Sequence, residues 1–365
     1  MTDGFHNIIP DSGSTYADKY QYFHSHWQGH VGASREAILQ GAAQATGSSV
    51  TILGAGDCKE IPLVELLHRF EFVNLVDVDE PSLARVIATL STEQQQRVRI
   101  IIKDLTGGAM QTLTEAAVGI IERSSAAGQA CQGLIELYET IELKDSVADD
   151  WRDLQSGYVV TSVVASQLLQ HPEHWIGQQF KAKFDKSPGE LQEYKYAKAK
   201  LELHLRMFAQ HARLIAWLAQ GGLAYWSCDV RQELVMGKLS PPHAQQLGLQ
   251  MTEYLRGIDW RVLKPKLAVD PQAGGHFTAY LTAQIGKQLL PVSLELEIIE
   301  YMVSAAQALD PGVTLDLVGG ELEGFFAPGL EPVGEKSTWL WHIYPSNFYR
   351  GGVHQVEAWL LRSLI

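Results

Sequence analysis

Cysteine is scarce in this chain, and charged residues are few. Only Cys58, Cys131 and Cys228 occur among 365 residues, far apart and with no C-x-x-C pair. This excludes a disulfide-stapled scaffold and a cysteine-rich zinc module. Charged residues make up 19% and hydrophobic residues 46%, against about 25% charged in an average soluble domain. The composition therefore excludes a disordered chain and predicts a sizeable core.

Positive charge is also in deficit. Lys and Arg number 29 against 42 Asp and Glu, a formal net charge of −13 with no dense basic stripe. Approach to a phosphate backbone or to anionic lipid is then unfavourable, so we expect neither a nucleic acid nor a membrane as partner. The N-terminus lacks a basic flank before an apolar run, and the longest nearly apolar stretch, residues 158–169, is too short to cross about 30 Å of hydrocarbon. We expect a cytoplasmic protein.

Short apolar runs alternate with segments of helical spacing through the first two thirds of the chain. The predicted strands are residues 49–56, 72–79, 98–105, 158–166 and 223–230. A long helix from about residue 190 to 220 precedes the fifth strand and ends at two glycines, a common C-terminal signal. This alternation predicts βαβ units in a doubly wound α/β sheet.

The last residues of the chain follow a different pattern. Segments 337–344 and 353–361 alternate in polarity around the Asn/Gly-containing loop PSNFYRGG, which is typical of an antiparallel hairpin. The predicted organisation therefore has four parts. They are an N-terminal helical lid segment at 1–46, a cofactor-binding α/β core at 47–235, an insertion or cap at 236–335, and a hairpin at 336–365 that completes the core sheet.

A glycine turn with the sequence GAGD, residues 54–57, ends the first strand. Such a turn lets the backbone approach a ligand at the carboxyl edge of the sheet. A dinucleotide site has the pattern G-x-G-x-x-G, but Lys59 stands at the third glycine position. Asp57 and Glu60 would also place negative charge beside a diphosphate. S-adenosylmethionine, which carries a sulfonium and an ammonium group, fits this turn better.

Two further acids follow the next strands. Asp77, at the tip of the second strand, can accept hydrogen bonds from two ribose hydroxyls. Asp104, at the tip of the third strand, is placed to meet the exocyclic amine of adenine. Because parallel strands share one carboxyl edge, these acids and the glycine turn are expected to line one site.

The segments VTILGAGDCKEIPL, NLVDVD and IIIKDLTG resemble the first three motifs of class I S-adenosylmethionine-dependent methyltransferases. The resemblance covers residues 49–105, and by pattern 158–230 and 337–361. It implies a Rossmann-like, mostly parallel seven-stranded sheet whose last strand is antiparallel. It also implies that Val78 packs on the adenine and that Leu105 flanks its amine edge. The predicted cofactor-binding residues are Gly54, Ala55, Gly56, Asp57, Asp77, Val78, Asp104, Leu105 and Ser162.

The segment after the fourth strand departs from one branch of this family. Enzymes that methylate base amines or glutamine carry an Asn/Asp-Pro-Pro-Tyr/Phe signature there, whereas this chain has TSVVASQ at 161–167. The resemblance therefore implies methyl transfer to a different acceptor, which we expect to be a small, metabolite-like molecule. Ser166 and Gln167 are candidate substrate contacts, with helix capping as their alternative role.

The first thirty residues are rich in aromatic residues and histidine. We predict that segment 16–30 covers the cofactor, with Tyr16 and Trp27 as substrate contacts and Tyr20 or His26 as the candidate general base. Packing of an ordinary N-terminal helix is the alternative. Although His26 and His30 lie one helical turn apart, no carboxylate or cysteine stands at ligand spacing, so no metal site is expected.

Two other functions remain open on the sequence. The chain could be a catalytically silent methyltransferase-like protein that binds a partner, with the insertion as the surface for that partner or for a second copy of the chain. It could also be a nicotinamide-dependent oxidoreductase, which Lys59 and the terminal hairpin disfavour.

Overall fold

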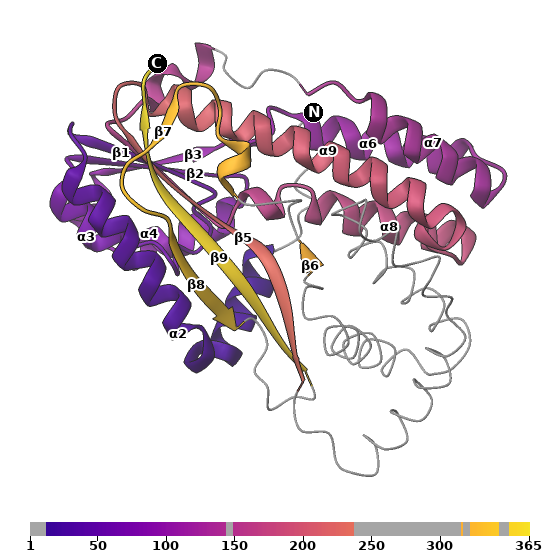
Figure 1. Ribbon diagram of the computed structural model, residues 1–365, viewed down its shortest axis with the longest axis horizontal. Helices are drawn as coiled ribbons and strands as arrows, with labels where there is room; N and C mark the ends of the chain where they lie inside the picture. The colour runs from indigo at the N-terminus through magenta and orange to yellow at the C-terminus, as the bar shows by residue number, and fades with distance from the viewer. Residues whose placement is uncertain (1–11, 144–148, 237–314, 317–321, 343–349) are drawn as a thin grey trace, which may run out of the picture.

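The computed structural model describes residues 12–143, 149–236, 315–316, 322–342 and 350–365. In this part of the chain a mixed sheet runs through the centre and helices cover both of its faces (Figure 1). None of the helices described in these ranges is long and apolar enough to cross a membrane. The predicted α/β class and doubly wound arrangement are confirmed.

The elements follow one another in the predicted alternation. The α-helices are α2 (Ser12–Gln44), α3 (Leu63–Arg69), α4 (Glu80–Ala88), α5 (Thr92–Gln95), α6 (Ala109–Arg123), α7 (Ala127–Thr140), α8 (Gln170–Phe184) and α9 (Gly189–Leu218). The strands are β1 (Ser49–Leu53), β2 (Phe72–Asp77), β3 (Val98–Ile102), β4 (Tyr158–Ser162), β5 (Leu223–Met236), β6 (Leu315–Asp316), β7 (Leu330–Pro332), β8 (Ser337–His342) and β9 (Arg350–Ser363). Short 3-10 turns are η1 (Asp149–Leu154), η2 (Ala165–Gln167) and η3 (Leu322–Phe325).

The strands lie in the order β3-β2-β1-β4-β5-β9-β7, with β6 beside β5 and β8 beside β9. The first five are parallel, and β9 is antiparallel to β5 and to β8. The predicted hairpin is therefore present as β8 and β9. Within the described ranges nine strands share the sheet instead of the predicted seven, because the very short β6 pairs with β5 and the very short β7 pairs with β9.

The strand order reverses between β1 and β4. The chain runs from β1 outward to β2 and β3 and then returns to pair β4 with the other side of β1. Connections leave in opposite directions at this point, which opens a crevice beyond the carboxyl ends of the two strands. A doubly wound sheet binds its ligand in such a crevice.

Each face of the sheet has its own apolar core. One face packs against α2, α3 and α4, where Ile38, Leu66 and Leu83 are fully buried against β1 and β2. The other packs against α9, and α6, α7 and α8 extend this layer into a bundle at one side of the sheet (Figure 1). Burial on both faces explains why the central strands are almost continuously apolar.

The range predicted as an insertion, 236–335, is partly sheet. Residues 237–314 and 317–321 lie outside the described part of the chain. Within the rest, β6 pairs with β5 and β7 pairs with β9. The core sheet therefore resumes before the predicted boundary at residue 335, because the three-residue β7 is too short to give a recognisable pattern.

Gly157, which precedes β4, allows a test of how tightly the backbone packs at the start of this strand. A Cβ there would lie 1.7 Å from the Thr46 carbonyl oxygen, and backbone cannot give way as a flexible side chain can. We expect Gly157→Ala to lower the free energy of unfolding by about 3 kcal/mol, the upper end for overpacking. In the matched control, Gly128→Ala on α7, the added methyl meets nothing within 4 Å, so stability should be unchanged or up to about 1 kcal/mol higher. Equal urea midpoints for the two variants would contradict this packing.

His211, on α9, gives a second prediction. Burial lowers its pKa to about 4, and its Nε2 lies 3.0 Å from the Thr161 hydroxyl on β4. The folded state therefore keeps this ring neutral, whereas the unfolded chain takes up a proton below about pH 6.5. The resulting stability is present above pH 6.5 and is lost towards pH 4, at about 1.4 kcal/mol per pH unit. Between pH 7 and pH 5 we expect wild type to lose about 2 kcal/mol more than His211→Gln in urea unfolding; parallel losses would refute the assignment.

Candidate functional site

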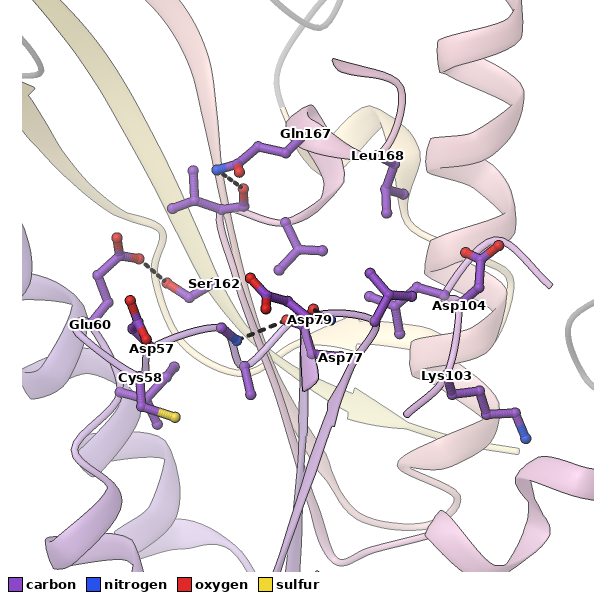
Figure 2. A pocket seen from close by; sticks show the side chains of 18 of the residues that line it. Asp57, Cys58, Glu60, Asp77, Asp79, Lys103, Asp104, Ser162, Gln167 and Leu168 are labelled. Carbon is purple, nitrogen blue, oxygen red and sulfur yellow. Dashed lines mark hydrogen bonds between the residues drawn. The ribbon is translucent and has the colours of Figure 1, made fainter. Parts of the chain in front are cut away.

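A pocket opens at the carboxyl ends of β1 to β4, where the strand order reverses (Figure 2). The nine residues predicted to bind a cofactor all line it, which brings Gly54, Ala55, Gly56, Asp57, Asp77, Val78, Asp104, Leu105 and Ser162 into one site. Gln167 lines it as well. The structure shows that they share one pocket, and their role toward a cofactor stays a prediction.

The glycine turn forms the floor of the pocket. The amides of Gly54 and Ala55 both donate to the Val76 carbonyl, at 2.8 and 3.2 Å, which holds the turn against β2. Gly54 has a φ of +65°, and a Cβ there would lie 2.3 Å from a methyl carbon of Val164. Glycine is therefore needed both for the conformation and for the close approach of the loop that follows β4.

Asp77 joins two loops of the pocket. One carboxylate oxygen accepts from the Gly56 amide at 2.8 Å, and the other accepts from the Asp79 amide at 2.9 Å. Burial raises the pKa of Asp77, while these backbone amides oppose the rise. The side chain therefore organises the glycine turn and the end of β2, and its contact with a ribose stays a prediction.

Asp104 organises the next loop in the same way. Its carboxylate accepts from the amides of Thr106 and Gly108, at 2.8 and 3.1 Å, and from the Thr106 hydroxyl. Both oxygens are thus already engaged by the loop before α6. Two oxygens offer about four acceptor sites, so the predicted contact with an adenine amine would add to these bonds.

The opposite end of the pocket is acidic. In Figure 2, Asp57 and Glu60 lie on the same side as Ser162, away from Asp104 and Leu168. The Asp57 side chain is 5% exposed, and Arg85 lies 3.2 Å from its Oδ1. Its Oδ2 is buried and accepts no hydrogen bond within the described chain. A buried carboxylate oxygen without a donor is costly, so a donor from water or from a ligand would stabilise it.

The loop after β4 has an unusual conformation. The predicted strand 158–166 ends at Ser162, because Val163 adopts a φ of +54°. Val163, Val164 and Gln167 then line the pocket. Ser166 does not; its hydroxyl donates to Asp229, whose other oxygen lies 2.8 Å from Nδ1 of His354. The predicted substrate contact at Ser166 is therefore turned toward β5 and β9.

The predicted N-terminal residues lie on α2. Trp27 is 1% exposed and packs edge-to-face on Trp341 of β8, with ring centroids 5.2 Å apart. It therefore belongs to the core beneath the hairpin and does not line the pocket. The backbone of Tyr16, Tyr20 and His26 is helical, but their side chains lie outside the described part. Their roles, and the covering of the cofactor by this segment, stay predictions.

The sequence argument missed several pocket residues. Val164 and Leu168 supply an apolar wall, and Thr106, Met110 and Pro172 also line the pocket. Glu60 entered that argument only as a loop charge. No spacing signal marks these residues, because they come together only when the loops after β1, β3 and β4 meet.

Comparisons with known proteins add little to this geometry. No family model matches the chain, and no curated protein matches it in sequence. Among solved structures, the chain is similar to the plantazolicin methyltransferase BpumL in complex with SAH, with 10% identity, 98% of this chain and 93% of that chain covered, and a TM-score of 0.27. At this identity and score the likeness carries no argument about function, which depends on the site.

Cys58 lies in the pocket wall. The reactivity of its thiol can be used to test whether this wall is buried and negatively charged. Burial, followed by the charges of Asp77 and Asp57, raises the pKa of this thiol to about 12. Its thiolate fraction at pH 8 is then about 10⁻⁴, and the thiolate is the reactive form. We expect iodoacetamide to alkylate Cys58 about a thousandfold more slowly in the folded protein than in urea, measured by peptide mass mapping. Rapid alkylation of the folded protein would contradict a buried, acidic pocket wall.

Proposed function

We propose that the protein binds S-adenosylmethionine and transfers its methyl group to a small-molecule acceptor. The observation that carries this proposal is the acidic pocket at the glycine turn, in which no described residue donates a hydrogen bond to a buried Asp57 oxygen. Among the described residues, five carboxylates line the pocket, against two lysines. Of these lysines, Lys103 lies with its ammonium 4.3 Å from the centre of the Trp151 ring, outside the acidic end.

The charge of the pocket separates the candidate cofactors. A dinucleotide would bring its diphosphate against Asp57 and Glu60, which disfavours a nicotinamide cofactor. S-adenosylmethionine brings a sulfonium and an ammonium and no phosphate. The Asp77 carboxylate at the β2 tip supplies acceptors for ribose hydroxyls, and Val78 and Leu105 supply apolar surface for a base. The residues present therefore fit this cofactor.

The residues of the pocket would orient the cofactor and exclude water; they need not activate the methyl group. The cofactor, when bound, supplies a methyl group already activated on a sulfonium. The glycine turn and Asp77 hold it in one orientation, and placement of this kind accounts for much of a transfer rate. Val164 and Leu168 line the pocket with apolar surface that excludes water from one side. An acceptor that must lose a proton needs a base as well, for which Tyr20 and His26 stay the candidates.

Binding of the cofactor and of S-adenosylhomocysteine is the first test. We expect micromolar dissociation constants by calorimetry, and a loss of about 1.5–3 kcal/mol in Asp77→Asn, the range for hydrogen bonds to a charged group. The control is Glu93→Gln on the exposed surface of α5, which should bind as wild type does. Thermal midpoints verify that both variants are folded. No binding by wild type, or equal binding by Asp77→Asn, would refute the proposal.

Two further measurements separate the alternative functions. Binding of reduced nicotinamide cofactor, followed by its fluorescence, would favour an oxidoreductase. Cofactor binding without turnover in the presence of a cell extract would favour a silent, partner-binding protein. Formation of S-adenosylhomocysteine that depends on a small-molecule fraction of the extract is the result we expect.

A further inference from the structure

A histidine and an aspartate form a hydrogen-bonded pair beside the pocket. Nδ1 of His354 on β9 lies 2.8 Å from one carboxylate oxygen of Asp229 on β5, and the Ser166 hydroxyl donates to the other oxygen. Asp229 is 7% exposed, so both oxygens of a buried carboxylate are engaged. The fold thereby holds the carboxylate in one orientation toward the histidine.

A β-bulge lies at this pair. Strands β5 and β9 run side by side over most of their length (Figure 1), but their register shifts at one point. Asp229 pairs with Val356 and Arg231 pairs with Gln355, so Val230 is an extra residue on β5. Bulges redirect side chains and are over-represented next to active sites. The irregularity of this ribbon therefore coincides with the position of the carboxylate.

The contact with Asp229 determines which ring nitrogen of His354 can accept a proton. An ionised carboxylate only accepts hydrogen bonds, so the proton of the neutral ring is on Nδ1 and Nε2 carries a lone pair. No described residue forms a hydrogen bond with Nε2, and the side chain is 13% exposed. An imidazole held in this tautomer is suited to act as a general base.

The pair lies on the side of the pocket that the predicted cofactor contacts leave open. Ser162 at the end of β4 pairs with Ser227, and Asp229 follows two residues later on the same face of β5. Ser166 and Gln167 are neighbours on η2; the first contacts Asp229 and the second lines the pocket. The tips of β2 and β3 are predicted to hold the ribose and the base. An acceptor would therefore approach from the side of β4 and β5.

Helix α2 reaches the pair from its other side. The Trp341 ring lies edge-on to His354, with centroids 6.0 Å apart, and Trp27 of α2 packs on the same indole. His30 of α2 stacks on the opposite partner of this contact, the face of Trp341. The segment predicted to cover the cofactor therefore enters the fold one aromatic ring away from His354.

Two other titratable side chains lie near Asp229. Burial, followed by the charge of Asp229, raises the pKa of the Cys228 thiol well above its usual range. Burial lowers the pKa of His204, and its Nε2 lies 3.2 Å from the Ala165 carbonyl oxygen. Both groups are neutral at pH 7, and His204 is tied to the backbone. Among the described titratable groups around this carboxylate, His354 is the one suited to proton transfer.

We propose that His354, positioned by Asp229, is the general base that takes the proton from a hydroxyl group of the methyl acceptor. The assignment rests on the proposed function and places the base on β9 instead of at Tyr20 or His26. In the step, Nε2 accepts the hydroxyl proton and the oxygen forms a bond to the methyl carbon. The electron pair of the breaking carbon–sulfur bond stays on sulfur, which becomes neutral.

The presence of a base indicates the class of acceptor. A hydroxyl oxygen is a poor nucleophile until its proton leaves, whereas a neutral amine attacks with its own lone pair. A buried aspartate that orients a histidine is therefore most useful for transfer to oxygen.

The pH dependence of the rate tests the base. Initial rates of S-adenosylhomocysteine formation are measured from pH 5 to pH 9, with the small-molecule fraction of a cell extract as the source of acceptor. Wild type should slow toward pH 5, because histidine takes up a proton in this range. His354→Gln should be about 10²–10⁴-fold slower at pH 8, the usual contribution of a general base, and should lose this pH dependence. His174→Gln, exposed on α8, should behave as wild type does.

Two measurements distinguish a base from a structural residue. By calorimetry, His354→Gln should bind S-adenosylhomocysteine within about twofold of wild type, because the ring lies outside the cofactor contacts. Histidine nitrogen NMR should place the ring proton of neutral His354 on Nδ1 in wild type and on both nitrogens in Asp229→Asn. That variant should transfer about ten- to a hundredfold more slowly, as is common when a carboxylate that orients a histidine is lost.

The product tests the acceptor class. With a cofactor labelled with ¹³C at the methyl group, NMR of the product distinguishes a methyl group on oxygen from one on nitrogen or carbon. We expect the label on oxygen, and a label on nitrogen or carbon would overturn the assignment.

The outcomes separate this assignment from the proposed function. Wild type that does not bind the cofactor, or binds it without transfer, overturns both. Transfer that is unchanged in rate and pH dependence in His354→Gln overturns the assignment alone, as does a loss confined to His26→Gln or Tyr20→Phe. If His354→Gln does not fold, a ring proton on Nε2 of wild type still refutes the assignment.

Discussion

The Asp77 carboxylate is the interaction on which the pocket depends. Its two oxygens accept the amides of Gly56 and Asp79, so one side chain joins the loops that leave two neighbouring parallel strands. Burying such a charge is costly unless hydrogen bonds compensate for the lost water. Here the backbone supplies them, through a turn in which Gly54 and Gly56 adopt positive φ angles of 65° and 45°, a conformation that glycine takes without strain. The shape of the pocket beyond the strand ends therefore follows from the hydrogen bonds that the Asp77 carboxylate accepts.

A second constraint is a hydrogen bond between residues that lie far apart in the sequence. Trp339 donates to His30 across 309 residues of sequence, and His30 in turn faces Glu60 in the pocket wall. Helix α2 and the terminal hairpin thereby share a polar contact within an otherwise apolar layer formed with Trp27 and Trp341. Apolar packing alone would allow many placements of α2 along the sheet. A directional hydrogen bond of this kind favours one placement of α2 over the others. It also couples the position of α2 and of the hairpin to the pocket wall.

The parts of the fold that could be predicted are those set by local pattern. Runs of β-branched residues, a glycine turn and acids at strand tips are each visible within a few residues, and the rule that parallel strands share a carboxyl edge assembles them into one pocket. The role of His30 could not be predicted, because its partners lie in distant segments. The burial of Trp27 could have been expected, because Tyr16, Tyr20, Phe23 and Trp27 recur at the spacing of one helix face. Its partner Trp341 could not, because it lies in a distant segment of the chain.

The loop after β4 shows why the prediction from sequence fails beside the pocket. The alternation through residues 158–166 predicts a longer strand, but Val163 takes a positive φ that β-branched residues rarely adopt. Such a conformation costs about 1–3 kcal/mol and persists only where the surroundings compensate for it. Val163 is 1% exposed among Trp27, Trp341 and Val356, so the chain ends supply that compensation. The turn directs Val164 into the pocket against Gly54. The N-terminal helix and the hairpin therefore act on the site from beneath, by holding one strained residue of its wall in place.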